Sequence, residues 1–286
     1  TSGTVTEMLF LGLTDLTDET VETVPELATE WSVSSDGLVW TFKMRKDVEW
    51  VHYDPATKKT AKLGKVTAND VVYGVKRMLD PATASTYAYV AYIIKGAEEF
   101  NTGESTDQDS VGVRAVDEYT VEFTLTQPAG YFPTIAGMWV CRPVHKDTVE
   151  KYGDKWTEPA NIVTNGPYML SVWEHEAKIV LVKNPYWYDA KDVSIETINM
   201  FMINEDSTAL AMYENGELDI VWVGPGDIER VRDDDNPLHA ELTIVPQLDV
   251  QYLAFDVTQP PFDDIKVRQA FALAVDRTRS AEVLWK

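Results

Sequence analysis

The stretch KYGDKWTEPANIVTNGPYML, residues 151–170, sets bulky aromatic rings beside two prolines and two glycines. Neither a helical nor a strand period is visible before its last few positions. Glycine and proline favour loops and turns because they allow or impose unusual backbone angles. The composition therefore predicts an irregular loop, and it raises the question of what its rings pack against.

Regular patterns precede this loop. Residues 36–50, DGLVWTFKMRKDVEW, alternate apolar and polar side chains as a half-buried strand does. Residues 66–81 predict a helix, with Thr67 as its N-cap and Asp70 in the capping-box position. Residues 111–125 predict a β-hairpin. The chain before the loop is thus expected to be rich in strands, with one clear helix.

The segments after the loop alternate between strand and helix patterns. Residues 168–187 predict a second hairpin whose turn covers 174–177, and residues 195–203 predict a further strand. A helix is expected over 207–216, followed by a strand over 218–223. A strand, a helix and a strand in this order are typical of an α/β unit.

The last part of the chain predicts one more strand and one more helix. The strand covers residues 250–257, VQYLAFDV, and the helix lies within residues 261–277. Either Asp263 or Asp264 can cap this helix. Arg277 would suit its C-terminal end, where the helix dipole favours a positive charge.

The charge balance excludes two classes of partner. The 286 residues carry 47 acidic and 25 basic side chains, a formal net charge of −22. Nucleic acid and anionic membrane surfaces both need clustered Lys and Arg, so neither is expected as a partner. No apolar run approaches the roughly 20 residues that span a bilayer. The chain opens at Thr1 without a signal peptide and stops inside an apparent helix, which suggests a piece of a longer protein.

Reactive residues are sparse. There is no G-x-S-x-G motif and no Walker loop, and the four histidines are scattered rather than set at zinc-ligand spacing. The single cysteine, Cys141, cannot form an intrachain disulfide, and a buried structural thiol is favoured over a nucleophile. We therefore expect no cofactor and no metal, and we do not expect an enzyme.

The aromatic residues are more informative. The chain has nine Trp, thirteen Tyr and nine Phe. Tyr87, Tyr89, Tyr92 and Trp222 lie where predicted strands give way to loops. Clefts form at such strand ends in open α/β sheets, and ligand clefts have aromatic walls. For Tyr87 and Trp222, position alone leaves a ligand cleft and the core as equal alternatives.

Six motifs in order give the chain a resemblance to a known family. They are PELATEWSVSSDGLVWTFKMRKDVEW, VTANDVVYGVKRMLDPATAS, KYGDKWTEPANIVTNGPYML, NPYWYDAKDVSIETINMFMI, YENGELDIVWV and PFDDIKVRQAFALAVDR. Together they resemble the oligopeptide- and dipeptide-binding proteins of bacterial ABC importers. This extracellular solute-binding family also includes nickel and oligosaccharide binders.

The resemblance implies an α/β fold: one lobe of a two-lobed periplasmic-binding-protein-like fold, with a mixed sheet and flanking helices. A strand-rich accessory subdomain is added, and most of the second lobe is absent. Residues 1–10 would start the main lobe, 11–145 form the accessory α+β subdomain, 146–247 form the main α/β lobe, and 248–286 cross the hinge into the second lobe. The loop at 151–170 would carry the chain back to the main lobe, and we expect its rings to pack this crossing rather than to touch ligand.

The resemblance also implies ligand-binding residues. Tyr87 matches a tyrosine that lines the cleft in the family. Trp222 stands where peptide binders often have a tyrosine, and Val223 and Gly224 replace polar residues beside it. Glu7 stands where the oligopeptide branch has an arginine, and this reversal of charge would change which ligand charges are tolerated nearby.

The implied function is that of the substrate-binding component of an ABC importer. A monomer would capture a peptide between two lobes, mainly through its backbone, and deliver it to the permease subunits in the membrane. It would be exported, to the periplasm or the outer face of the cytoplasmic membrane, and the sequence leaves a lipid anchor in the full-length parent open. Two alternatives stay open: the same fold binding oligosaccharides, and a hydrolase acting on peptides or glycosides.

Overall fold

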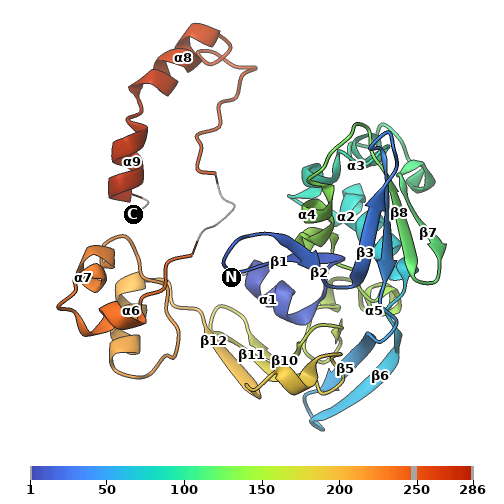
Figure 1. Ribbon diagram of the computed structural model, residues 1–286, viewed down its shortest axis with the longest axis horizontal. Coiled ribbons are helices and arrows are strands. Elements are labelled where there is room, and N and C mark those ends of the chain that lie inside the picture. Colours follow the sequence, from blue (N-terminus) through green and yellow to red (C-terminus); the bar gives the residue numbers. More distant parts are fainter. Residues whose placement is uncertain (1, 246–249, 285–286) are drawn as a thin grey trace. The chain divides into compact units, whose positions relative to one another are not determined.

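A computed structural model describes residues 2–245 and 250–284 (Figure 1). The chain forms two compact units, Thr1–Met202 and Ile203–Lys286. Their boundary falls inside the segment 146–247 that we expect to form the main lobe, and the end of that segment lies outside the described residues. The predicted four-part division stays a prediction.

A four-stranded antiparallel sheet organises the first unit. Its strands, in spatial order, are β3 (Ala28–Val33), β4 (Val39–Met44), β8 (Thr120–Thr124) and β7 (Val113–Asp117). The hairpin predicted over 111–125 is therefore confirmed. The strand predicted over 36–50 is instead two strands, because a turn after Met44 interrupts it. Arg45 Nε donates to Asp47 Oδ1 at 2.7 Å within this turn, and the chain continues in another sheet.

The predicted helix is α2 (Ala68–Leu79), which packs against β7 and β8. The Asp70 carboxylate accepts hydrogen bonds from the backbone N–H of Thr67 at 2.7 Å and from its hydroxyl at 2.9 Å. These contacts confirm the predicted cap. Apolar side chains on one face of the helix, among them Val71 and Val75, are buried and anchor it to the sheet.

Aromatic rings fill the space under this sheet. Phe42 and Phe123 meet edge to face at 5.7 Å, and Phe123 meets Phe132 in the same way at 5.1 Å. Phe132 begins α4 (Phe132–Gly137), so this short helix closes the core from a second element. Edge-to-face pairs add about 0.5–1.5 kcal/mol to the stabilisation from burial alone.

Smaller sheets and short helices complete the first unit. The hairpin predicted over 168–187 and the strand predicted over 195–203 are confirmed by one of these sheets. The sheets are β1 (Thr14–Leu16) with β2 (Thr23–Pro25), β6 (Lys59–Lys65) with β5 (Glu49–Asp54) and β9 (Val163–Thr164), and β10 (Tyr168–Glu174) with β11 (Lys178–Lys183) and β12 (Thr197–Phe201). The helices are α1 (Ser2–Leu9), α3 (Ala97–Asn101) and α5 (Lys146–Tyr152), with 3₁₀ turns η1 (Pro81–Thr83), η2 (Ala88–Ala91), η3 (Gln108–Ser110), η4 (Trp139–Cys141), η5 (Gly153–Lys155) and η6 (Ala190–Asp192).

The loop at 151–170 crosses the end of α1. The backbone N–H groups of Asn165 and Gly166 donate to the carbonyl of Leu9 at 3.1 and 2.9 Å. The side-chain Oδ1 of Asn165 accepts from the N–H of Leu11 at 2.8 Å. Upstream, Trp156 packs against Phe10 with ring centroids 6.2 Å apart. The loop therefore packs against the end of α1. Its passage between a subdomain and the main lobe, and its lack of contact with ligand, stay predictions.

Gly166 is required by the closeness of this crossing. A Cβ atom at this position would lie 2.6 Å from the carbonyl oxygen of Met8 and 2.7 Å from the carbonyl carbon of Leu9. Both neighbours are backbone atoms at the end of α1, which cannot move without displacing the helix. Any side chain here would push the loop away from α1.

The second unit contains helices and irregular segments in its described part. The helices are α6 (Asp206–Glu214), α7 (Ile228–Arg232), η7 (Pro237–Glu241), α8 (Ile265–Ala274) and α9 (Arg277–Leu284). The helices predicted over 207–216 and within 261–277 are confirmed. Asp264 rather than Asp263 caps α8, since its Oδ1 accepts from the N–H of Lys266 at 2.7 Å. We expected Arg277 at the C-terminal end of this helix, but α8 ends at Ala274 and Arg277 begins α9.

Two predicted strands are wrong for this chain. The segments 218–223 and 250–257 pair with no strand in the described residues. Ile220 is 85% exposed and Tyr252 is 77% exposed. An apolar run becomes a strand only when a neighbouring strand accepts its hydrogen bonds, so the expected strand–helix–strand unit does not form. Every strand pair in the described part of the chain is antiparallel.

The crossing at Asn165 gives a stability prediction. We expect Asn165→Ala to lower the free energy of unfolding by about 1–3 kcal/mol, because the buried N–H of Leu11 loses its acceptor. The matched control is Asn161→Ala, whose side chain makes an exposed hydrogen bond to the carbonyl of Lys155 and should cost less than about 1 kcal/mol. Urea unfolding at pH 7 measures both, and equal costs would contradict the role given to the crossing.

Candidate functional site

Tyr87 lies at the surface of the first unit. It precedes η2 and is 43% exposed. Its ring stacks on Tyr89 with centroids 6.1 Å apart and meets Trp139 edge to face at 5.3 Å. We call Tyr87, Tyr89 and Trp139 the ring cluster. Tyr92 behaves differently, because it is half-buried and its hydroxyl donates to Asn101 Oδ1 at 2.6 Å, which makes it a structural residue.

Trp222, Val223 and Gly224 lie together on one loop of the second unit. Trp222 and Val223 line a hollow of about 590 Å³, which α6, α7 and the segment 238–245 complete. Trp222 is 70% exposed, whereas Leu210 on α6 is buried. The hollow is large enough for a small ligand and mostly apolar.

Gly224 has a packing role in this loop. It is buried, and a Cβ atom there would lie 2.5 Å from Oδ2 and 2.8 Å from Cβ of Asp206. The absence of a side chain therefore lets the loop approach the first residue of α6. Gly224 can offer a ligand only its backbone.

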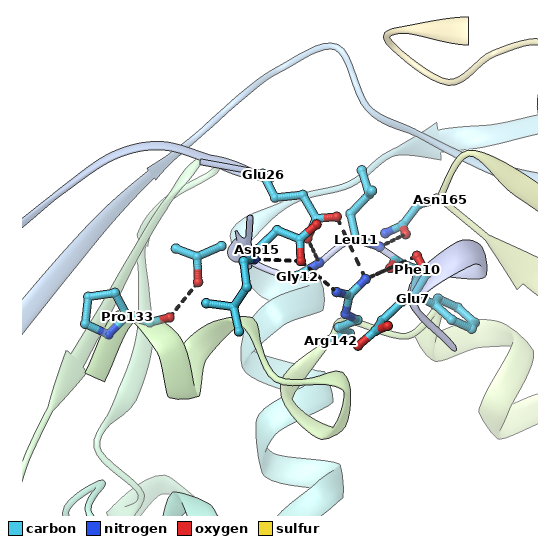
Figure 2. Close-up of polar contacts among 11 residues, drawn as sticks. Glu7, Phe10, Leu11, Gly12, Asp15, Glu26, Pro133, Arg142 and Asn165 are labelled. Carbon is cyan, nitrogen blue, oxygen red and sulfur yellow. Dashed lines mark hydrogen bonds and ion pairs between the residues drawn. The ribbon is translucent and has the colours of Figure 1, made fainter. Parts of the chain in front are cut away.

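Glu7 is exposed near the C-terminal end of α1, beside a buried arginine (Figure 2). Arg142 is only 4% exposed. It donates from Nη1 to the backbone carbonyls of Glu7, at 3.3 Å, and of Phe10. Carbonyls at a helix C-terminus lack partners within the helix and favour a nearby positive charge. Arg142 thus fixes the end of the helix that carries Glu7.

Glu26 completes the buried network around Arg142 (Figure 2). Its Oε2 accepts from the N–H of Gly12, and its Oε1 lies 3.8 Å from Arg142 Nη1. Asp15 Oδ1 lies 3.8 Å from Nη2 of the same arginine. Burial raises the pKa of Glu26 to about 8, although the charge of Arg142 lowers it. The Glu26 carboxyl is therefore mostly protonated at neutral pH.

The five residues implied by the resemblance fall in both units. Tyr87 and Glu7 belong to the first unit, and the loop of Trp222, Val223 and Gly224 belongs to the second. Their contact with a ligand stays a prediction.

Sequence reasoning missed Trp139, Arg142 and Glu26. Arg142 directly follows Cys141 in the sequence, but burial raises the pKa of that thiol to about 12, so the arginine has no thiolate to stabilise there. The acidic Glu26 inside the apolar run from Val24 to Ala28 was the available signal for a buried charge partner.

The described residues hold little reactive chemistry. Nowhere in 2–245 or 250–284 do three His, Cys, Asp or Glu side chains gather as metal ligands. Within the same ranges, no helix has the length and apolar character needed to cross a membrane. The arrangement offers exposed rings and an apolar hollow, which are features of binding surfaces.

Comparison with known proteins gives a consistent result. Residues 22–286 match the family described as bacterial extracellular solute-binding proteins, family 5, middle region. The periplasmic oligopeptide-binding protein OppA of Salmonella typhimurium is 37% identical over 276 residues, covering 96% of this chain and 48% of that protein. The dipeptide-binding protein DppE of Bacillus subtilis is 33% identical over 266 residues, covering 93% of this chain and 46% of that protein.

The fold is also similar to solved structures. OppA of Burkholderia pseudomallei matches with a TM-score of 0.82 at 33% identity, covering 97% of this chain and 52% of that chain. The predicted α/β class and the resemblance are confirmed. The chain spans about half the length of the relatives it matches, as expected for one lobe of a two-lobed fold.

The buried carboxyl of Glu26 predicts a pH dependence of stability. A pKa of about 8 in the fold, against 4.5 for the free side chain, means that the folded chain holds this proton more tightly. The stabilisation of the fold by this proton is fully present below pH 4.5 and is lost as the pH rises through 8. The side chain of Glu26→Gln stays neutral at every pH, so the stability of the variant should not show this loss. We expect the free energy of unfolding of the wild type to fall by on the order of 3 kcal/mol relative to the variant between pH 5 and pH 9.

Urea unfolding at several pH values measures this difference in free energy. Glu22→Gln is the control, because Glu22 is exposed in the neighbouring turn and should leave the pH profile unchanged. A constant difference between Glu26→Gln and the wild type would show that Glu26 does not titrate in this range.

Proposed function

Since this chain belongs to family 5 of the bacterial extracellular solute-binding proteins, we propose that the natural protein carrying it captures peptides for an ABC importer. The match to oligopeptide- and dipeptide-binding relatives along nearly the whole chain carries this proposal. The protein is exported, to the periplasm or the outer face of the cytoplasmic membrane, and hands its ligand to permease subunits. It acts as a monomer and catalyses no reaction.

Capture follows from closure of two lobes around the ligand. This chain supplies one lobe, and the peptide backbone is held by strand-like hydrogen bonds that do not depend on side-chain identity. Ligand favours the closed form because it touches both lobes only in that form. Side chains enter roomy pockets where water adapts to them, which allows many peptide sequences.

The proposed ligand residues are Tyr87, Glu7, Trp222, Val223 and Gly224. The exposure of Tyr87 and Trp222, at 43% and 70%, supports this role, since core aromatics such as Phe42 are fully buried. Glu7 would place a negative charge near the ligand and favour positively charged peptides.

Oligosaccharides are the second candidate ligand, because the exposed face of Trp222 offers a surface on which a sugar ring can stack. In that case Trp222→Ala would abolish sugar binding, because the surface for stacking is lost. Calorimetry of the natural protein and this variant with short peptides and with oligosaccharides separates the two candidates. Binding of sugars alone by the wild type would reject the peptide proposal.

Closure also predicts how the isolated chain behaves. We expect residues 1–286 alone to bind mixed short peptides at least about tenfold more weakly than the natural protein, because contacts from the other lobe are missing. Isothermal titration of both samples with the same peptide mixture measures this. Tight, stoichiometric binding by residues 1–286 would contradict the clamp.

A further inference from the structure

The ring cluster is built on a rigid support. Tyr87 and Tyr89 come from the segment of η2, and Trp139 comes from η4. Both 3₁₀ turns pack against α2, which lies on the main sheet of the first unit. The rings are therefore held in place by the core, yet Tyr89 is 57% exposed and Tyr87 is 43% exposed. A tightly packed group of large rings left in water is typical of a binding surface.

No Lys or Arg side chain in the described residues makes a cation–π contact with the rings of this cluster. Elsewhere in the part of the chain that the structure describes, six Lys or Arg side chains lie over aromatic rings, as Arg45 lies over Tyr188 at 3.2 Å. Across the described residues, no such contact covers Tyr87, Tyr89 or Trp139. The chain thus shields many of its partly exposed rings but leaves this group open.

The backbone before the cluster adopts an unfavourable conformation. Ala84 ends η1 with φ 51° and ψ 38°, in the left-handed region that a residue with a Cβ rarely adopts. This residue turns the chain from η1 toward Tyr87. Such conformations persist where the surrounding structure enforces them, and they cluster at ligand-holding segments.

From these observations we infer that the ring cluster is a subsite for an aromatic side chain of a bound peptide. The inference rests on the proposed peptide-capturing function and adds a ligand preference to it. A ring of the ligand would extend the packing already present, stacking as Tyr89 stacks on Tyr87 or meeting an edge as Trp139 does. Tyr89 and Trp139 thereby become specificity-determining residues.

Titration calorimetry on the full-length natural protein tests the subsite. Two peptide pools of three to five residues serve as probes, one with Phe and one with Ala at the same positions. We expect the wild type to prefer the Phe pool. Tyr89→Ala and Trp139→Ala should each lower the affinity for the Phe pool by about three- to tenfold. Each should change the affinity for the Ala pool by less than about twofold. Tyr89→Phe keeps the ring and should keep the preference.

The matched control is Tyr131→Ala. Tyr131 is 58% exposed, like Tyr89, but makes no ring contact with the cluster; its loss should leave both pools unchanged. Unchanged affinity for the Ala pool also shows that each variant is folded.

Three outcomes would overturn the inference. The first is that the Tyr89 and Trp139 variants lose affinity equally for the Phe pool and the Ala pool. The second is that the wild type shows no preference for the Phe pool. The third is dependence on Tyr89 and Trp139 for a Lys pool instead, which would make the cluster a cation site. In all three, peptide binding itself persists and the proposed function stands. Absence of binding to every peptide pool, with binding of oligosaccharides, would reject the proposed function as well.

Discussion

The first unit depends on one buried crossing, where the loop around Asn165 and Gly166 meets the end of α1. The carbonyl of Leu9 accepts two hydrogen bonds from this loop, and the N–H of Leu11 donates to Asn165. Buried backbone groups need partners, so the helix end and the loop satisfy each other. The same loop pairs with β5 through β9 on one side and opens β10 on the other. One short segment thereby joins α1 and two sheets.

The network around Arg142 fixes the same helix end from the opposite side. A guanidinium with little solvent contact needs acceptors, and it finds them in the carbonyls of Glu7 and Phe10. The protonated Glu26 adds a neutral partner on Gly12 rather than a full countercharge. Buried ion pairs contribute little net stability when desolvation is counted, so the value of this network lies in fixing one backbone path.

Local patterns predicted the local elements well. The helix α2 and the hairpins of β7 with β8 and β10 with β11 follow from periods and caps that lie within each segment. The strands predicted over 218–223 and 250–257 do not form, because a strand also needs a neighbouring strand, which its own residues do not encode. The same reason explains Trp139 and Arg142. Their partners lie far away along the chain, and no spacing rule connects Trp139 to Tyr87 or Arg142 to Glu26.

The apolar segment 218–223, whose Ile220 and Trp222 are exposed, has a consequence for colloidal behaviour. Exposed apolar backbone that joins no sheet is a template for β-pairing between molecules. Opposing this attraction, a net charge of −22 repels copies from one another. Dissolved salt screens the repulsion and leaves the β-pairing intact. Concentrated solutions of this chain should therefore be clearest at low ionic strength and become turbid as salt is added.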